Sequence, residues 1–132
     1  MTDARDDLTG LLNRTEFRRA VKSTIDTTRD EDQHCLLYID LDEFKVVNDT
    51  CGHRAGDELL RQVSASLVGL LRQSDTVARL GGDEFGVLLR HCSRARGVEL
   101  AEQIIEIIND KRFHYRDRVF HVGASIGMVS MN

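Results

Sequence analysis

Four acidic residues stand where the chain is expected to end a strand and to turn a hairpin, and their chemistry suits a metal-bound nucleotide. Asp40 and Asp42 follow a short apolar run, whereas Asp83 and Glu84 follow two glycines. If both segments are neighbours in one sheet, several carboxylates converge. Mg²⁺ is typically held by one or two carboxylates together with water and substrate phosphates. The alternative is that these side chains are only solvated, and the carboxylates alone do not decide between the two.

The hydrophobic pattern predicts the elements that position these residues. Asn13 followed by Glu16 is an N-cap pattern, and it predicts a helix that ends at about Thr28. The segment Gly81-Gly82-Asp83 predicts a hairpin turn, because glycine accepts a positive φ. The expected order is helix, strand, helix, hairpin, helix, hairpin. The later helices are expected from Ala55 to about Leu71 and around 101–108. The strands are expected at 35–40, 75–80 and 84–89 and in two runs that are joined at 116–117 and end at Met131.

The composition predicts one globular domain. The chain has 132 residues, of which 41% are hydrophobic and 30% charged, and no apolar run approaches the length of a membrane span. The net charge of −4 argues against a general nucleic-acid partner. Because the first residues are polar and do not resemble a secretion signal, we expect a cytoplasmic domain. Cys35, Cys51 and Cys92 match no disulfide or zinc pattern and are expected to be packing thiols.

Four motifs in order resemble the GGDEF family of diguanylate cyclases. The segment 81–85 reads Gly-Gly-Asp-Glu-Phe, and residues 40–57 resemble the family pattern D-x-D-x-F-K-x-x-N-D followed by G-H-x-x-G-D. Residues 6–14 are similar to its N-terminal motif, and residues 124–127 to its late strand. A single short motif carries a high risk of coincidence, but four in the right order do not. The chain is therefore identified as a member of this family.

The resemblance implies the metal and catalytic residues. Asp40 and Asp83 would bind Mg²⁺ (or Mn²⁺), the Leu41 carbonyl would assist, and Glu84 would join at a second metal. Bound metal would align a ribose 3′-hydroxyl for attack on the α-phosphate of a second GTP and neutralise the leaving pyrophosphate. Either Asp83 or Glu84 would be the catalytic base, and the sequence does not separate them.

The substrate-binding residues follow from the same resemblance and are Phe44, Lys45, Asn48, Asp57, Gly81 and Gly82. Lys45 would meet the phosphates, and the two glycines would let the hairpin backbone approach the nucleotide. Asn48 and Asp57 would read guanine, because an amide and a carboxylate complement its carbonyl and N–H groups. The simpler readings are a loop residue for Asn48 and a first-turn helix acid for Asp57. His53 is expected to be structural.

A regulatory site is implied by Arg72 and Asp75, which match the family's R-x-x-D product-inhibition motif. An arginine can form paired hydrogen bonds with a phosphate or with guanine acceptors. The alternative is an arginine that ends a helix and interacts with its dipole. Gln103 stands where many members have another arginine, so reduced affinity for cyclic di-GMP is expected.

The resemblance also implies an architecture and partners. The fold would be α/β (α+β), with about five mainly antiparallel strands flanked by helices, like a nucleotidyl cyclase or a polymerase palm. Residues 1–132 would be a single GGDEF domain truncated at the C-terminus, because the family's final helix would follow Asn132. Without that helix, we expect this segment to be weakly active or inactive. Two domains, each holding one GTP, would have to meet as a homodimer.

The amino-acid sequence of the motifs looks most like that of GGDEF domains fused to EAL phosphodiesterases. Such proteins usually carry sensory modules and can be membrane-anchored. The alternative function is thus a non-catalytic domain that binds GTP or cyclic di-GMP and regulates an attached EAL phosphodiesterase. Degenerate regulatory copies often lose a metal carboxylate or a glycine, whereas Asp40, Gly81, Gly82, Asp83 and Glu84 are all present. The cyclase is the favoured interpretation.

Overall fold

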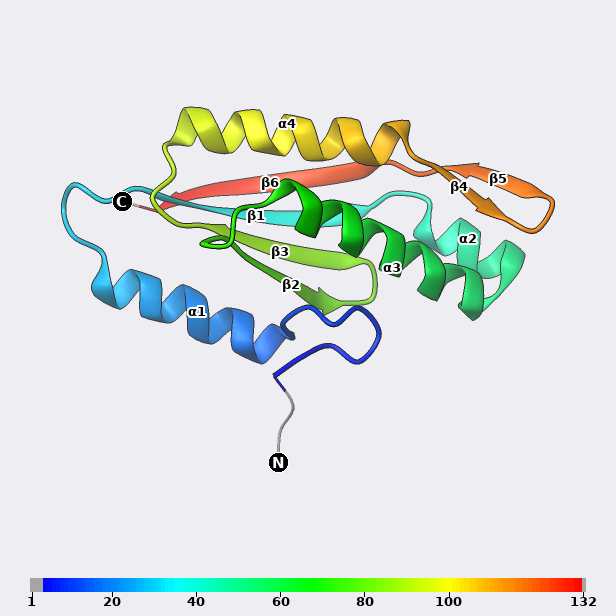
Figure 1. Cartoon of the computed structure of the whole chain (residues 1–132), viewed down its shortest axis with the longest axis horizontal. Helices are drawn as coiled ribbons and strands as arrows, with labels where there is room; N and C mark the ends of the chain where they lie inside the picture. Colours follow the sequence, from blue (N-terminus) through cyan, green and yellow to red (C-terminus); the bar gives the residue numbers. More distant parts are fainter. Residues whose placement is uncertain (1–3, 132) are drawn as a thin grey trace.

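The protein, described as a computed structural model for residues 4–131, is built around a four-stranded antiparallel sheet in the order β2-β3-β1-β6. A separate ribbon of two strands, β4-β5, lies beyond one end of this sheet and next to α2 (Figure 1). The strands are β1 (His34–Leu41), β2 (Thr76–Gly81), β3 (Glu84–Leu89), β4 (Arg112–Tyr115), β5 (Arg118–His121) and β6 (Ala124–Met131).

Within residues 4–131, two of the four helices begin at a side chain that caps them. The Asn13 side chain accepts a hydrogen bond from the Glu16 amide at 3.0 Å, and Ser93 accepts one from the Arg96 amide at 3.1 Å, so both side chains satisfy amides that a helix start leaves free. The helices are α1 (Arg14–Thr27), α2 (Phe44–Cys51), α3 (His53–Leu70) and α4 (Arg94–Asp110).

The helices cover the two faces of the sheet unequally. On one face, α3 and α4 pack over the larger core, which includes Leu37 and Ile39 of β1. On the other face, α1 packs along β2 at the lower edge of the sheet in Figure 1, over a smaller cluster that contains Phe17 and Leu36. Because side chains alternate along a strand, the even-numbered residues of β1 therefore lie on the α1 face.

The register of the central strand sets the position of the acidic residues. Strand β1 pairs with β3 so that Asp40 lies opposite Glu84, and it pairs with β6 so that Asp40 lies opposite Ser125. Opposite residues in an antiparallel pair point to the same face. Asp40 and Glu84 are therefore neighbours on the α1 face, at the end of the sheet where the β2–β3 turn lies.

The predicted α/β class with a mainly antiparallel sheet is confirmed, and two details differ. The expected fifth strand is not part of the main sheet: the last predicted run divides near Gly123 into β5, which belongs to the ribbon, and β6. Helix α2 was not expected, and Asn48 lies within it instead of in a loop. None of the helices within residues 4–131 is both long and apolar enough to cross a bilayer.

Candidate active site

The β2–β3 turn brings an acidic residue to the end of β1. Gly81 and Gly82 have φ values of 144° and 48°. Residues that carry a Cβ atom rarely adopt such values, so glycine is required in this turn. The backbone amide of Leu41 donates a hydrogen bond to the Asp83 carbonyl at 3.2 Å. This bond fixes the turn against the last residue of β1. The antiparallel pairing of β2 with β3 confirms the predicted hairpin.

Asp40 and Asp83 form a pair of interacting carboxylates. Burial raises the pKa of Asp83 above its ordinary value, and the neighbouring charge and hydrogen bond of Asp40 raise this pKa further. Two carboxylates that disfavour each other's charge would be relieved by a bound cation. Their oxygen atoms, together with the nearby backbone carbonyls, are ligands that suit Mg²⁺. The donor set therefore fits the expected metal.

Glu84 lies beside the Asp40–Asp83 pair and also faces an arginine of α1. Its carboxylate lies 3.9 Å from the Arg14 guanidinium of α1, and both side chains are about half exposed. Within the described range, no three His, Cys, Asp or Glu side chains are grouped in a way that could hold a metal ion. Protein side chains thus supply two carboxylates, which agrees with a site that water and substrate phosphates complete.

Asp42 lies just beyond the end of β1, where it is hydrogen-bonded to the start of β6. Strand β1 ends at Leu41, so the alternation of side chains stops before Asp42. Its carboxylate accepts a hydrogen bond from the Ser125 hydroxyl at 3.1 Å, and its amide donates to the Gly123 carbonyl at 2.9 Å. Asp42 therefore holds the start of β6 beside the site.

The loop after β1 presents the expected phosphate-binding residues at the start of α2. Glu43 precedes this helix with a φ of 69°, a left-handed conformation that is uncommon for a residue with a side chain. Phe44 packs against the larger core, whereas Lys45 is exposed. Phe44 thus anchors the helix start, and the ammonium group of Lys45 stays accessible to an anion.

Asn48 and Asp57 come from two helices that pack closely. A Cβ atom at Gly56 would collide with the Asn48 amide, so the glycine lets α2 and α3 approach at this point. The Asn48 Oδ1 atom is buried and has no hydrogen-bond partner among the described residues. An unpaired buried oxygen is costly, and a ligand that donates an N–H group would satisfy it. Asp57 is half-buried one residue after Gly56 and lines a cavity of about 470 Å³ together with Tyr115.

Arg72 and Asp75 bind each other in a turn after α3. The Arg72 guanidinium donates to both Asp75 carboxylate oxygens, at 3.0 and 3.3 Å, and to the Arg90 carbonyl at 3.1 Å. Helix α3 ends at Leu70 and its C-cap is Leu71, so Arg72 is the first residue after the cap. The pair lines a small cavity with Cys92 and with Arg96 of α4. The cavity lining does not include Gln103.

The β2–β3 turn is also held by an ion pair between Arg79 and Asp6, which the sequence analysis did not predict. The Arg79 guanidinium lies 3.2 Å from Asp6 and also donates to the Gly82 carbonyl at 3.1 Å. Asp6 in turn accepts hydrogen bonds from the amide and the hydroxyl of Thr9, both at 2.8 Å. Arg79 directly precedes Leu80 and the glycines, so its position next to the motif was the available signal.

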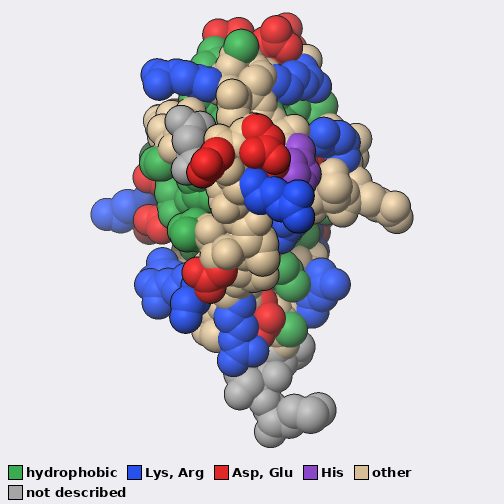
Figure 2. Space-filling view, turned by 90° about the vertical axis from the view of Figure 1, so that its left-hand side faces the viewer, with side chains coloured by type: hydrophobic (Ala, Val, Ile, Leu, Met, Phe, Trp, Pro, Cys, Tyr) green, Lys and Arg blue, Asp and Glu red, His purple; other side chains and the backbone are tan. Residues whose placement is uncertain are grey.

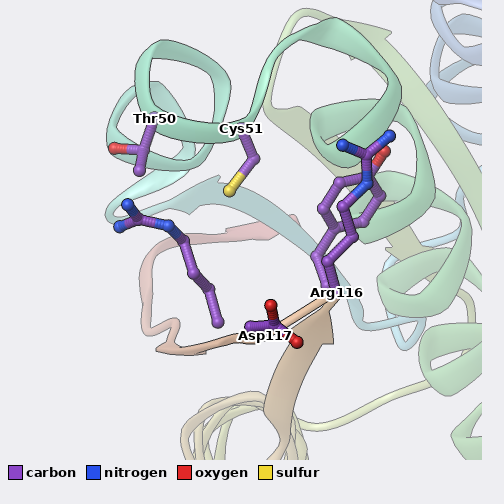
Figure 3. A pocket seen from close by; sticks show the side chains of 6 residues that line it. Thr50, Cys51, Arg116 and Asp117 are labelled. Atoms are coloured by element: carbon purple, nitrogen blue, oxygen red, sulfur yellow. The ribbon is translucent and has the colours of Figure 1, made fainter.

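One further cavity, of about 260 Å³, lies between the end of α2 and the β4–β5 turn and contains no predicted site residue. Figure 3 shows the Cys51 sulfur directed into it, with Thr50 on one side and Arg116 and Asp117 on the turn. The end of the molecule opposite the β2–β3 turn carries basic and acidic side chains that are interspersed (Figure 2). His53 is exposed at the start of α3.

Comparisons with known proteins identify relatives of the whole chain. A family model described as "Diguanylate cyclase, GGDEF domain" matches residues 3–132. The chain is 45% identical over 127 residues to the "Probable diguanylate cyclase DgcE" of Escherichia coli, covering 96% of this chain and 12% of that protein. It is 35% identical over 124 residues to the "Cyclic di-GMP phosphodiesterase PdeB" of Shewanella oneidensis, covering 94% of this chain and 14% of that protein. The chain thus spans a small part of the length of these relatives.

A solved structure shares the fold. The GGDEF domain of DgcB from Caulobacter crescentus, described in complex with c-di-GMP, superimposes with a TM-score of 0.88 and 25% identity, covering all of this chain and 80% of that one. Because the family model matches almost the whole sequence and the fold agrees, this chain belongs to the diguanylate cyclase GGDEF-domain family.

Proposed function

We propose that the chain is the catalytic domain of a diguanylate cyclase, which condenses two GTP molecules into cyclic di-GMP and two pyrophosphates. The observation that carries this proposal is the pair of interacting carboxylates, Asp40 and Asp83, at the end of the sheet where two glycines leave the backbone open. Family membership supports the same chemistry. The domain combines a donor set for a hard cation with a buried, unpaired acceptor on Asn48.

The proposed metal is Mg²⁺, or Mn²⁺, held by Asp40, Asp83 and the Leu41 carbonyl, with Glu84 as a further ligand. When bound, such a metal lowers the pKa of the attacking 3′-hydroxyl and neutralises charge on the phosphates. The protein's own task is to hold two carboxylates close together in spite of their repulsion. The Leu41–Asp83 hydrogen bond and the β1–β3 register perform this task.

Guanine recognition is proposed for Asn48 and Asp57. The buried Asn48 Oδ1 atom lacks a donor, and the N–H groups of guanine would supply one. Adenine has a different arrangement of donors and acceptors, so it would leave polar groups of the site unpaired. Phe44 positions the start of α2, Lys45 would meet the phosphates, and Gly81 and Gly82 would let the nucleotide lie against the hairpin.

Each domain would bind one GTP, so catalysis requires a homodimer in which two such sites face each other. The 3′-hydroxyl of each nucleotide would then attack the α-phosphate of the other, with departure of pyrophosphate. The product, cyclic di-GMP, would bind at Arg72 and Asp75 and inhibit the enzyme. The solved relative bound to c-di-GMP supports product binding by this fold.

A turnover experiment tests the proposal. The full-length protein that carries this domain is incubated with GTP and Mg²⁺, and cyclic di-GMP is measured by chromatography. Wild type should form the product, and Asp83→Asn, which keeps the size of the side chain, should not. A dimeric wild-type protein that binds GTP but forms no cyclic di-GMP would refute the cyclase assignment.

The second candidate is a domain that binds GTP or cyclic di-GMP and regulates an attached EAL phosphodiesterase. The resemblance to a protein named as a cyclic di-GMP phosphodiesterase favours it. In this case the full-length protein would hydrolyse cyclic di-GMP, and GTP would change that rate without being consumed.

We propose that the domain lies in the cytoplasm, where GTP is available, and that sensory and EAL modules are fused to it as its partners.

A further inference from the structure

A cavity of about 230 Å³ lies between α1 and the β2–β3 turn, and no role has been given to it so far. Two arginines of α1, Arg14 and Arg18, line it together with Tyr38 of β1 and Glu84 of β3. The apolar side chains of Phe17 and Leu80 complete its wall. The cavity therefore offers two guanidinium groups and one phenol, next to a single carboxylate.

The cavity adjoins the proposed metal site on the same face of the sheet. Tyr38 and Asp40 are two residues apart on β1, so both side chains lie on the α1 face. Glu84, which lines the cavity, lies directly opposite Asp40 in the β1–β3 register. An anion that extends from the carboxylate pair along this face would thus enter the cavity.

The charges on α1 are arranged as expected for an anion site. Arg14 and Arg18 are four residues apart on one helix, so their side chains lie on the same face, and like charges at this spacing repel. Arg14 lies 3.9 Å from Glu84, which is beyond hydrogen-bonding distance. Arg18 is exposed, and its guanidinium group makes no hydrogen bond or ion pair with any other residue of the range 4–131.

The neighbouring Arg19 gives a useful contrast. It is held by Glu16 of its own helix at 3.1 Å, and it is not among the residues that line the cavity. The acidic partner within α1 therefore neutralises Arg19, which does not line the cavity. The two arginines that face the site keep donors free for another group.

We propose that Arg14 and Arg18, with the Tyr38 hydroxyl, bind the terminal phosphates of the nucleotide and the pyrophosphate that leaves. This inference rests on the proposed function, because it assigns a subsite to the same substrate. Guanidinium groups form charge-assisted hydrogen bonds with phosphate oxygens, and two of them suit the charge of a β,γ-diphosphate. Arg14 would exchange its distant contact with Glu84 for the phosphate.

The competing explanation is that Arg14 only neutralises Glu84 and that Arg18 is only solvated. Under this explanation, loss of either arginine would affect all nucleotides alike or none. A phosphate subsite instead predicts an effect that depends on the number of phosphates in the ligand. Binding of GTP, GMP and inorganic tripolyphosphate separates the two explanations.

The experiment measures dissociation constants by isothermal titration calorimetry in Ca²⁺, which limits turnover. Arg14→Ala and Arg18→Ala should each weaken GTP and tripolyphosphate binding about tenfold, as expected for loss of one charge-assisted contact. GMP affinity should change less than about twofold, because GMP lacks the terminal phosphates. Arg18→Lys should recover part of the GTP affinity. Arg19→Ala is the matched control on the same helix and should bind GTP like wild type.

Thermal unfolding of each variant shows whether the fold is intact. Unchanged GTP affinity in both folded alanine variants would overturn the inference while leaving the cyclase proposal in place. An equal loss for GTP and GMP would overturn it too, since that pattern indicates a structural effect. A wild-type protein that binds no GTP would refute the proposed function itself, and the subsite with it.

Discussion

Asp6→Asn tests whether the catalytic hairpin depends on an ion pair behind it. The Asp6 carboxylate accepts hydrogen bonds from Thr9 and lies 3.2 Å from the Arg79 guanidinium, and the Arg79 side chain also holds the Gly82 carbonyl. The side chains of Arg79 and Asp6 are 18% and 19% exposed, so solvent screens their interaction only in part. The amide of Asn keeps the size of the side chain but removes its charge.

The expected loss lies between that of a surface pair and that of a buried pair. Exposed ion pairs contribute about 0–1 kcal/mol, and breaking a buried pair costs about 3–5 kcal/mol. We therefore expect Asp6→Asn to lower the free energy of unfolding by about 1–3 kcal/mol at neutral pH. For a domain of this size, that loss corresponds to a fall of about 3–10 °C in the unfolding temperature.

The pH dependence gives the sharper check. Burial alone would raise the pKa of Asp6, but hydrogen bonds from Thr9 and the Arg79 charge outweigh it and lower the pKa. A lowered pKa stabilises the fold above the unfolded-state value of about 3.9, and this contribution is lost as the pH falls through the folded-state pKa. The difference between wild type and Asp6→Asn should therefore shrink on acidification below that value.

Urea unfolding at neutral pH and at about pH 3 measures both quantities. Asp7→Asn is the matched control, because Asp7 is the exposed neighbour of Asp6 and should show little change. Equal stability of wild type and Asp6→Asn at neutral pH would refute the reasoning. A stability difference that stays constant on acidification would show that charge is not its cause.

Three further substitutions test other parts of the site. Asp83→Asn should abolish cyclic di-GMP formation yet raise the unfolding temperature of the metal-free protein by about 2–4 °C, because it removes a partly buried charge and its repulsion from Asp40. Since the folded-state pKa of Asp83 is raised, this gain should be present above that pKa and vanish below about pH 3.9, and a less stable variant would contradict this reasoning. Gly56→Ala should displace the Asn48 amide, cost about 1–3 kcal/mol of stability and weaken GTP binding in calorimetry, whereas retained affinity would separate Asn48 from the base site. Arg72→Ala should weaken cyclic di-GMP binding about tenfold and cost about 1–2 kcal/mol of stability, because the Asp75 side chain is 2% exposed and loses its charged partner, keeping only the backbone amide of residue 72. Unchanged affinity in calorimetry would refute the product site.

Sequence patterns predicted well the elements that local rules specify. The Asn13 cap fixes the start of α1, and the paired glycines fix the β2–β3 turn, because only a few residue types meet these local requirements. Helix α3 has a long apolar face, which made it clear. The juxtaposition of Asp40 and Asp83 followed from the assumption that their strands are neighbours, and the β1–β3 pairing confirms that assumption.

Features that depend on distant contacts were not predicted. Helix α2 has eight residues, which is too short for a clear period, and Glu43 before it provides no side-chain cap. The break between β5 and β6 lies where Asp42, just after the neighbouring strand β1, binds Gly123 and Ser125, which are far from it in the sequence. The ion pair between Asp6 and Arg79 joins residues far apart in the sequence, so no spacing rule reveals it.

The register of β1 also protects the site against a specific error. A slip by one residue would turn Asp40 from the α1 face to the face that α3 and α4 bury, and it would expose Leu37 and Ile39 in exchange. The apolar core thus fixes the position of the acidic residues, because the misaligned pairing would bury the Asp40 charge and expose apolar side chains to water. Substitutions deep in the core of β1 can therefore silence the site without touching any residue that binds nucleotide or metal.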